Sequence, residues 1–212
     1  EIAQCLVGSE MCIRDRYGGV SISYADGDAS YSRGSGDNHS RAMNFYVTEM
    51  GNKGHYLDVV LRFHHIDTNF KMFDENGKKI RGDMHNVGIS LSSEYGRKKM
   101  IDDKGWYIEP QGQLTIGYLG GDNYTTSNGI AVRQGGIRSA LGRIGFNLGK
   151  DIDEKTNIYL KANLLHEFGG GYHAAMADNS GSRIKIDRSF KDTWFEYGIG
   201  AVSYTHLTLP TT

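Results

Sequence analysis

The chain has 212 residues, with 24 Lys and Arg against 25 Asp and Glu, and a formal net charge of −1. This balance excludes a nucleic-acid or anionic-membrane partner that is held by bulk charge. The sequence contains no run of about 18 apolar residues and so predicts no transmembrane helix. Its 29 glycines disfavour long helices, because each interior Gly costs about 1 kcal/mol relative to Ala. An all-β chain remains, either soluble or membrane-spanning.

The two ends of the chain do not resemble the rest of it. LVGSEMCIRDR (6–16) and VSYTHLTLPTT (202–212) resemble one-frame translations, in opposite orientations, of the transposase adapter DNA used in sequencing libraries. We therefore expect residues 1–16 and 202–212 to be non-native and residues 17–201 to be one natural domain. Cys5 and Cys12 both fall in the first segment, so they predict neither a disulfide nor a metal site.

Between these ends, apolar and polar residues alternate repeatedly, and loops rich in Gly, Asp and Asn interrupt the alternation. A period of two residues is typical of β-strands with one apolar face. In chain order, the sequence predicts strands at Tyr17–Asp26, Ser40–Met50, His55–Phe70, His85–Tyr95, Trp106–Leu119, Gly129–Gly135, Ile137–Lys150, Asn157–Phe168, Arg183–Ile186 and Thr193–Ala201. It predicts solvated loops at 34–40 and 123–129, and hairpin turns that include GNKG (51–54), DENGKK (74–79), DDKG (102–105) and ADNSGS (177–182).

Many of these strands reach the length of about 9–11 residues that crosses a bilayer at a tilt. Alternation alone does not say which face is inside. A soluble barrel or sandwich puts the apolar face inward, whereas an outer-membrane barrel turns it toward lipid around a polar lumen. Mixed charges in mid-strand favour the second arrangement. So do aromatic residues toward strand ends, which we expect at the membrane interface: Trp106, Tyr118 and Phe168.

The polar faces then supply the candidate site residues. We expect ten side chains to line the channel, hydrate it and hold a segment inside it: Asp58, Arg62, Glu109, Gln111, Gln113, Arg143, Lys161, Asn163, Glu167 and Glu196. The alternative is that these residues only neutralise one another across neighbouring strands.

Five blocks of the chain go further than periodicity: NFYVTEMGNKGHYLDVVLRF (44–63), GWYIEPQGQLTIGYL (105–119), GRIGFNLG (142–149), IYLKANLLHEFGGG (158–171) and FKDTWFEYGIGA (190–201). In this order and spacing, they resemble the β-barrel domain of autotransporters (type V secretion). The resemblance covers essentially all of 17–201 and implies an antiparallel up-and-down transmembrane β-barrel in the Gram-negative outer membrane. It also implies that the chain carries about 8–10 of about 12 strands, so we expect an incomplete barrel.

The resemblance further implies the function and the partners. The barrel would export an N-terminal passenger and anchor it at the cell surface. Its partners would be outer-membrane lipid, its own passenger and linker helix, which we expect to be absent from this chain, and the barrel-assembly machinery. A passive porin-like or an omptin-like outer-membrane barrel stays open as an alternative, and a soluble lectin-like domain is a third.

We expect no catalytic residue and no cofactor, and hence no enzyme activity in this domain. We also expect no metal site. His64 and His65 are adjacent, and neighbouring residues of a strand point to opposite faces, so this pair does not chelate one ion together. The glycine runs precede no helix and lack the GxxxxGK[ST] pattern of a phosphate loop. They are more consistent with bends and tight loops in a barrel.

Overall fold

The computed structural model describes residues 7–13, 16–153 and 156–203. Two outer parts of the adapter-like ends, 1–6 and 204–212, lie outside the described residues, as does 14–15. Strand β1 covers residues 7–13 within the first of these ends. The interpretation of 1–16 and 202–212 as non-native stays a prediction. Within the described residues, no helix is long and apolar enough to cross a membrane.

Nearly all of the described chain is antiparallel β-structure. The main sheet contains β1 (Val7–Ile13), β2 (Arg16–Tyr31), β3 (Gly34–Met50), β4 (His55–Phe73), β5 (Lys79–Arg97), β6 (Lys99–Met100), β7 (Trp106–Leu119), β10 (Ile137–Asp151), β11 (Thr156–Glu167) and β14 (Thr193–Ser203). A second, smaller sheet contains β8 (Asn123–Thr125), β9 (Ala131–Gln134), β12 (Gly171–Ala177) and β13 (Arg183–Ser189). A short 3₁₀ turn, η1 (Asn52–Gly54), joins β3 to β4.

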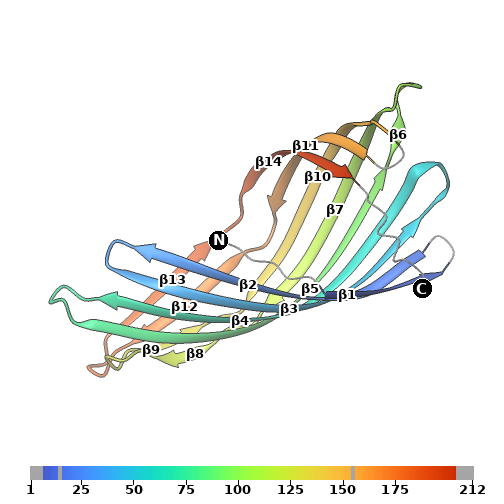
Figure 1. The fold of residues 1–212 in the computed structure, drawn as a ribbon. Coiled ribbons are helices and arrows are strands. Elements are labelled where there is room, and N and C mark those ends of the chain that lie inside the picture. The colour runs from blue at the N-terminus through green and yellow to red at the C-terminus, as the bar shows by residue number, and fades with distance from the viewer. Residues whose placement is uncertain (1–6, 14–15, 154–155, 204–212) are drawn as a thin grey trace, which may run out of the picture.

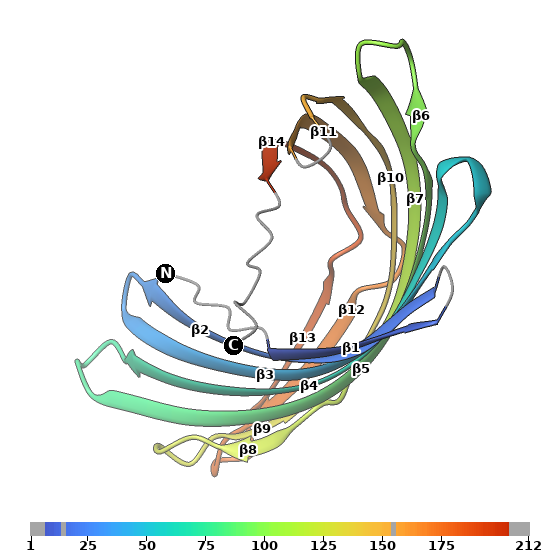
Figure 2. The ribbon, with the colours of Figure 1, turned by 45° about the vertical axis from the view of Figure 1, so that its right-hand side comes forward.

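The main sheet curls around itself without closing (Figures 1 and 2). Its strands follow the order β1-β2-β3-β4-β5-β7-β10-β11-β14, and β6 pairs with β7 beside this path. Within the described residues, β1 and β14 lie at opposite ends of the path and do not pair with each other. The prediction of an incomplete, antiparallel, up-and-down barrel is confirmed, with nine strands along the path.

The two rims of the curled sheet differ. At one rim, short connections join β3 to β4, β5 to β7 and β10 to β11; we call it the short-turn rim. At the other rim, β2 to β5 extend as long hairpins, and the second sheet lies beside them (Figure 2); we call it the long-loop rim. The second sheet is attached there by hydrogen bonds to β5. One of them joins the backbone N–H of His85 to Asp122 Oδ2 at 2.7 Å.

Several predicted boundaries were wrong at the long-loop rim. The predicted loop at 34–40 belongs to β3, where Gly34 pairs with Tyr31 and Ser40 with Ala25. The predicted loop at 123–129 begins with β8, and the predicted strand at 129–135 is the shorter β9 in the second sheet. No strand was predicted at β12. Backbone pairing continues beyond the stretch of each hairpin in which apolar and polar residues alternate, and a strand without that alternation is not marked by the sequence pattern.

The predicted turns have the backbone geometry that their glycines favour. Gly54, Gly77, Gly105 and Gly181 all have positive φ, between 75° and 91°. This left-handed conformation costs Gly little because it has no Cβ. Each of these glycines lies in a predicted turn motif, so turn chemistry identified the hairpins even where strand ends were misplaced.

Burial in the sheet is the reverse of that in a soluble protein. Asn44, Asn86 and Asn163 are each only 5% exposed, whereas Ile144 is 64% exposed and Leu114 is 53% exposed. Apolar residues on alternate positions of the strands thus face outward, and polar residues face the concave side. A soluble barrel would show the opposite, so the outer surface is suited to lipid.

Close strand packing at the short-turn rim depends on glycine–tyrosine pairs. Tyr107 lies opposite Gly149 in the β7–β10 register, and Tyr159 lies opposite Gly200 in the β11–β14 register. A Cβ on Gly149 would lie 2.5 Å from the Tyr107 ring and 2.8 Å from the Ile158 carbonyl oxygen. Such contacts are too short, so this glycine leaves room for an aromatic ring on the next strand. The high Gly and Tyr content of the sequence has this physical cause.

Candidate functional site

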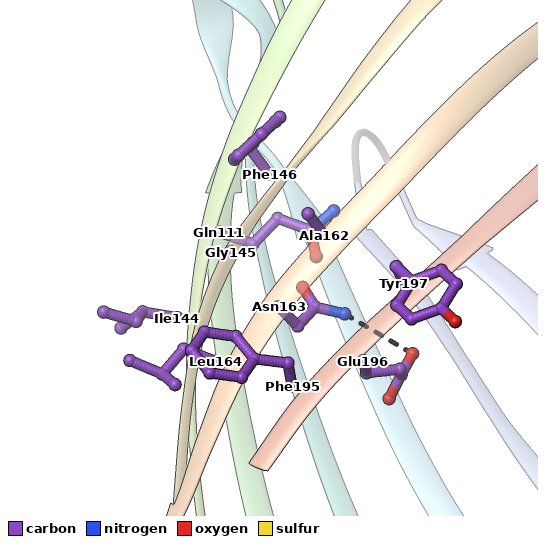
Figure 3. A pocket seen from close by; sticks show the side chains of 10 residues that line it. All are labelled: Gln111, Ile144, Gly145, Phe146, Ala162, Asn163, Leu164, Phe195, Glu196 and Tyr197. Atoms are coloured by element: carbon purple, nitrogen blue, oxygen red, sulfur yellow. Dashed lines mark hydrogen bonds between the residues drawn. The ribbon is translucent and has the colours of Figure 1, made fainter. Parts of the chain in front are cut away.

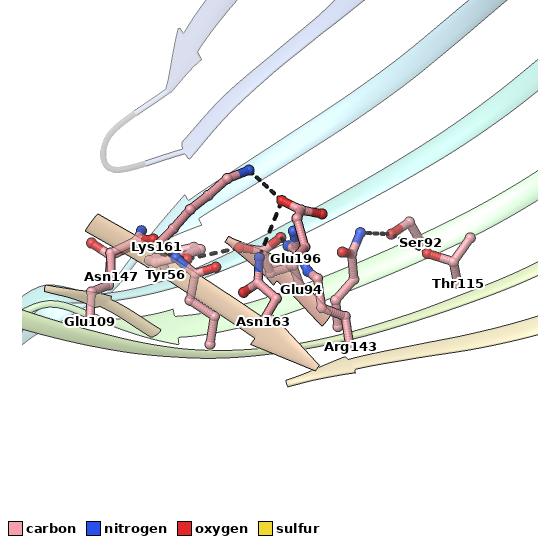
Figure 4. A network of polar contacts seen from close by, with 12 residues as sticks. Tyr56, Ser92, Glu94, Glu109, Thr115, Arg143, Asn147, Lys161, Asn163 and Glu196 are labelled. Atoms are coloured by element: carbon pink, nitrogen blue, oxygen red, sulfur yellow. Dashed lines mark hydrogen bonds and ion pairs between the residues drawn. The ribbon is translucent and has the colours of Figure 1, made fainter. Parts of the chain in front are cut away.

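The ten polar residues predicted to line a channel lie on five strands of the main sheet and alternate with outward apolar residues. Asp58 and Arg62 belong to β4, and Arg143 belongs to β10. All ten except Arg62 are buried or half-buried. The structure brings most of them into one polar face on the concave side of the sheet (Figure 4). Their role in a channel stays a prediction.

An ion pair between Glu94 and Arg143 lies at the centre of this polar face (Figure 4). Arg143 Nη2 and Glu94 Oε2 are 2.5 Å apart, and the two side chains are 21% and 18% exposed. The Tyr56 hydroxyl donates to Glu94 Oε1 at 2.9 Å and also reaches Glu109 Oε1 at 3.4 Å. Glu109 accepts a further hydrogen bond from Asn147 Nδ2 at 3.1 Å. Four strands are therefore linked through side chains.

A second ion pair joins Lys161 of β11 to Glu196 of β14. Asn163 Nδ2 donates to the same Glu196 Oε1 at 3.4 Å (Figures 3 and 4). On the opposite part of the sheet, Arg62 Nε donates to Asn44 Oδ1 at 2.6 Å. The polar face thus contains cross-strand hydrogen bonds and two ion pairs, Glu94–Arg143 and Lys161–Glu196, in which opposite charges meet directly.

The other predicted polar residues have local partners. Gln111 Nε2 donates to Glu109 Oε1 at 2.9 Å, and Gln113 Nε2 donates to Ser92 Oγ at 2.5 Å. Glu167 differs from the rest. It accepts hydrogen bonds from the backbone N–H groups of residues 140 and 169 and from the residue 139 hydroxyl. This carboxylate thus joins the end of β11 to the start of β10 and to the loop that follows β11, instead of joining the central network.

Two atoms of the polar face have no hydrogen-bond partner in the described part of the chain. They are Asp58 Oδ1 and Arg143 Nε, and both are buried. One is an acceptor and the other a donor, and leaving either unpaired away from water costs free energy. The polar face can therefore satisfy additional polar groups on its concave side.

Glu94, Tyr56 and Ser92 were missed as site residues, although all three lie within strands that the alternation predicts. Glu94 falls four residues after Ser90 on the polar side of β5 and is the partner of Arg143. Because alternate residues of a strand point to the same face, its position in β5 alone could have placed Glu94 on this face. Its pairing depends on the stagger between β5, β7 and β10, which the sequence does not give.

The three aromatic residues predicted for the membrane interface are exposed on the outer surface or at a strand end. Trp106 is 42% exposed, Tyr118 is 47% exposed and Phe168 is 59% exposed. Trp106 is the first residue of β7, and Tyr118 is the last but one. About 40 Å of strand separates them. At the tilt of about 45° that is typical of barrels, this corresponds to about 28 Å, close to the thickness of a bilayer core. Their interfacial role stays a prediction.

An apolar groove of about 550 Å³ crosses the sheet where β14 forms its free edge (Figure 3). Ile144, Leu164 and Phe195 line it from the outer surface, and Asn163 and Glu196 reach it from the polar face. Phe195 is 78% exposed. The groove is open and lies against the lipid-facing side, so its geometry is that of a gap beside an edge strand and not of an enclosed substrate pocket.

Comparison with known proteins identifies one family. The family model for the autotransporter beta-domain matches residues 13–205. Pertactin autotransporter of Bordetella parapertussis is 35% identical over 153 residues, which cover 69% of this chain and 16% of that protein. Probable autotransporter YcgV of Escherichia coli is 30% identical over 189 residues, which cover 87% of this chain and 19% of that protein. The chain therefore spans less than a fifth of these relatives.

Solved structures agree on the fold. The beta domain of the Bordetella autotransporter BrkA aligns with a TM-score of 0.66 and 22% identity, covering 94% of this chain and 88% of that one. The translocator domain of NalP from Neisseria meningitidis aligns with a TM-score of 0.69 and 11% identity, covering 93% and 79%. At these identities, the likeness establishes the barrel architecture.

Proposed function

Because the chain belongs to the autotransporter beta-domain family, we propose that it exports a passenger encoded on its N-terminal side and anchors that passenger at the cell surface. The domain is an outer-membrane barrel of a Gram-negative bacterium. The observation that best supports this proposal is that the curled sheet buries polar residues and exposes apolar ones. Asn163 is buried on the concave face, and Ile144 is 64% exposed on the outer face. A wall of this kind separates lipid from a hydrated passage.

The concave polar face is proposed to contact the segment that passes through the barrel. Opposite charges already meet in the Glu94–Arg143 and Lys161–Glu196 pairs, so the face attracts neither sign strongly. The free atoms Asp58 Oδ1 and Arg143 Nε supply an acceptor and a donor. A passing backbone carries N–H and C=O groups at every residue and needs such partners. This combination suits a segment of any net charge.

The orientation of the barrel follows from its rims. Outer-membrane barrels have short periplasmic turns and longer extracellular loops. On that basis, the short-turn rim faces the periplasm, and the long-loop rim with its second sheet faces the outside. The proposed partners are outer-membrane lipid around the apolar surface, the passenger and a linker helix in the lumen, and the barrel-assembly machinery during insertion.

The proposal assigns no catalysis to this domain. One relative, the serine protease Pet autotransporter of Escherichia coli, is matched over only 14% of its own length, and the match covers 82% of this chain. Any enzyme activity of the whole protein would then belong to its passenger. Passenger chemistry is not encoded in the strands described above.

Surface display tests the export function directly. The intact gene is recovered from its source, an epitope tag is placed in the region preceding Tyr17, and the whole protein is produced in a Gram-negative host. We expect antibody to label intact cells, and we expect labelling to disappear when the barrel is deleted. A tag that stays inaccessible while the barrel is correctly inserted, as judged by heat-modifiable gel mobility, would contradict export.

The role of the polar face is tested separately in the same strain. Replacing Glu109 and Arg143 together by Gln should reduce display, because it removes charge from the centre of the lumen. The matched control replaces Lys98 by Gln and Asp151 by Asn and should leave display unchanged. These residues form an ion pair at the short-turn rim, with an Nζ–Oδ1 distance of 2.8 Å. Unchanged display in the Glu109→Gln, Arg143→Gln barrel would show that these residues only stabilise the sheet.

A further inference from the structure

A row of histidines and aspartates crosses four strands on the outer surface, near the long-loop rim. Asp26 of β2 stands opposite His39 of β3, His39 opposite Asp67 of β4, and Asp67 opposite His85 of β5. In each strand, these residues point to the same outer face as the apolar residues. They lie closer to the long-loop rim than the band of apolar residues does. The row is on the opposite face of the sheet from the polar network, so channel lining does not explain it.

Two histidine side chains of this region converge on one carboxylate. Asp67 Oδ1 lies 2.8 Å from His65 Nε2 and 2.7 Å from His85 Nδ1. The three potential ligand atoms all lie within 4.8 Å of one another. The His65 and His85 rings are stacked, with centroids 6.4 Å apart and an interplanar angle of 21°. Two imidazoles thus present a nitrogen each to the same small volume.

This set has the chemistry of a transition-metal site. Imidazole nitrogen with carboxylate oxygen suits Zn²⁺, Cu²⁺ and Ni²⁺, whereas Mg²⁺ and Ca²⁺ prefer oxygen ligands alone. Bond lengths of about 2.0–2.2 Å in a tetrahedral Zn²⁺ site place ligand atoms about 3.3 Å apart. The two histidine–aspartate distances need to lengthen slightly and the histidine nitrogens need to approach each other. Exposed imidazoles can do so by small rotations.

We propose that His65, Asp67 and His85 bind a divalent transition-metal ion, Zn²⁺ in the first instance. Three protein ligands leave the remaining coordination positions to water. The negative carboxylate of Asp122, which accepts the backbone N–H of His85 at 2.7 Å, adds a favourable charge for a cation nearby. Arg41, which is positively charged, stands opposite His65 in the register of β3 and β4. The bound ion joins β4 to β5 where the hairpin leaves the apolar band.

Sequence patterns alone did not reveal this site. His64 and His65 are neighbours and point to opposite faces, and a Cβ on Gly88 would contact the His64 ring at 2.1 Å. His64 is therefore packed against β5 on the polar side. The partner of His65 is instead Asp67, two residues on, together with His85 from the next strand. Only the register between β4 and β5 brings these three residues together.

Metal titration of the whole protein in detergent tests the proposal. Calorimetry with Zn²⁺ should give one saturable site, and Co²⁺ should give the visible absorption bands of a nitrogen-ligated ion. Mg²⁺ at the same concentration should not compete. Loss of a residue that only hydrogen-bonds to a metal ligand typically lowers the metal affinity about 10–100-fold. Loss of a direct ligand in His65→Gln, Asp67→Asn or His85→Gln should therefore weaken Zn²⁺ binding at least about 10-fold.

A matched control is available in the second sheet. His173 and Asp187 form a similar exposed pair at 2.5 Å, but no third metal ligand joins them among the described residues. His173→Gln should leave Zn²⁺ affinity unchanged. Heat-modifiable mobility confirms that each variant is folded. The proposal is overturned if folded wild-type protein shows no stoichiometric site, if the three ligand variants bind as tightly as wild type, or if His173→Gln weakens binding equally.

Discussion

At the scale of single residues, the Glu94–Arg143 pair illustrates how a barrel lumen differs from a soluble core. Both side chains are about four-fifths buried, and each has lost most of its hydration. Removing one partner of a buried pair leaves an uncompensated charge, which is usually more costly than removing both. The stability of this sheet therefore depends on the match between the two residues more than on either charge.

A double-mutant cycle makes this quantitative. We expect Arg143→Ala to destabilise the whole barrel domain by about 2–3 kcal/mol, because Glu94 then stays partly buried without its partner. Adding Glu94→Ala should recover part of that loss, with a coupling free energy of about 1–2 kcal/mol. Denaturant unfolding in detergent or lipid vesicles measures all four forms. Strictly additive losses would show that the two residues do not act as a pair.

Asp178 provides a prediction outside the membrane. Its Oδ1 accepts hydrogen bonds from the Ser180 hydroxyl at 2.7 Å and from the Ser182 N–H at 2.8 Å in the β12–β13 turn. These bonds lower the pKa of the Asp178 carboxyl. A lowered folded pKa means that the turn is stabilised above the unfolded pKa and that this contribution disappears as pH falls through the folded pKa.

An NMR titration of the side-chain carboxyl tests this expectation in the intact domain. The Asp178 signal should titrate below the ordinary aspartate range. Replacing Ser180 by Ala should move its pKa upward, because the largest lowering contribution comes from that hydroxyl. An Asp178 pKa at or above the ordinary value would contradict the turn geometry.

At the scale of elements, alternation and turn chemistry predicted most strands that face the membrane. The β7 bounds, Trp106–Leu119, match the predicted strand, because one side must be apolar and the other polar across the full bilayer. Where β2 to β5 extend past the bilayer, neither face has to be apolar. Alternation of apolar and polar residues therefore does not mark these parts of the strands. β12 contains Ala174 and Ala175 with no alternation, so it was missed. The polar partners on the concave face could not be paired because register is a property of neighbouring strands.

The glycine–tyrosine packing predicts a specific sensitivity to substitution. Gly149→Ala should destabilise the barrel domain by about 1–3 kcal/mol, the usual cost of overpacking. The new methyl would meet the Tyr107 ring and the Ile158 carbonyl oxygen. Gly112→Ala is the control on the neighbouring strand, because its Cβ meets nothing within 4 Å. Thermal unfolding followed by gel mobility measures both. Equal stability of the two variants would show that close packing at Gly149 is unimportant.

At the scale of the whole molecule, the described sheet has two unpaired edges. β14 is one of them, and its outward side chains Phe195, Tyr197 and Ile199 are 78%, 85% and 88% exposed. An edge strand presents a row of free N–H and C=O groups. In the bilayer core, each unsatisfied group costs several kcal/mol, so stable spanning sheets close into barrels. The family resemblance already predicted an incomplete barrel with open edges, whereas the identity of the edge strands and the exposure of the β14 side chains required the structure.

The open edges predict how this 212-residue chain behaves by itself. Produced alone and refolded in detergent, it should aggregate or associate through β14 instead of giving a compact, heat-modifiable monomer, because lipid-like surroundings supply no partners for its edge backbone. Extending the chain with the flanking coding sequence of the source gene should restore a monomer if the added strands pair with the two edges. Size-exclusion chromatography and gel mobility compare the two forms. A heat-modifiable monomer from the 212 residues alone would mean that β14 finds a partner within the chain, and that the sheet can close without added strands.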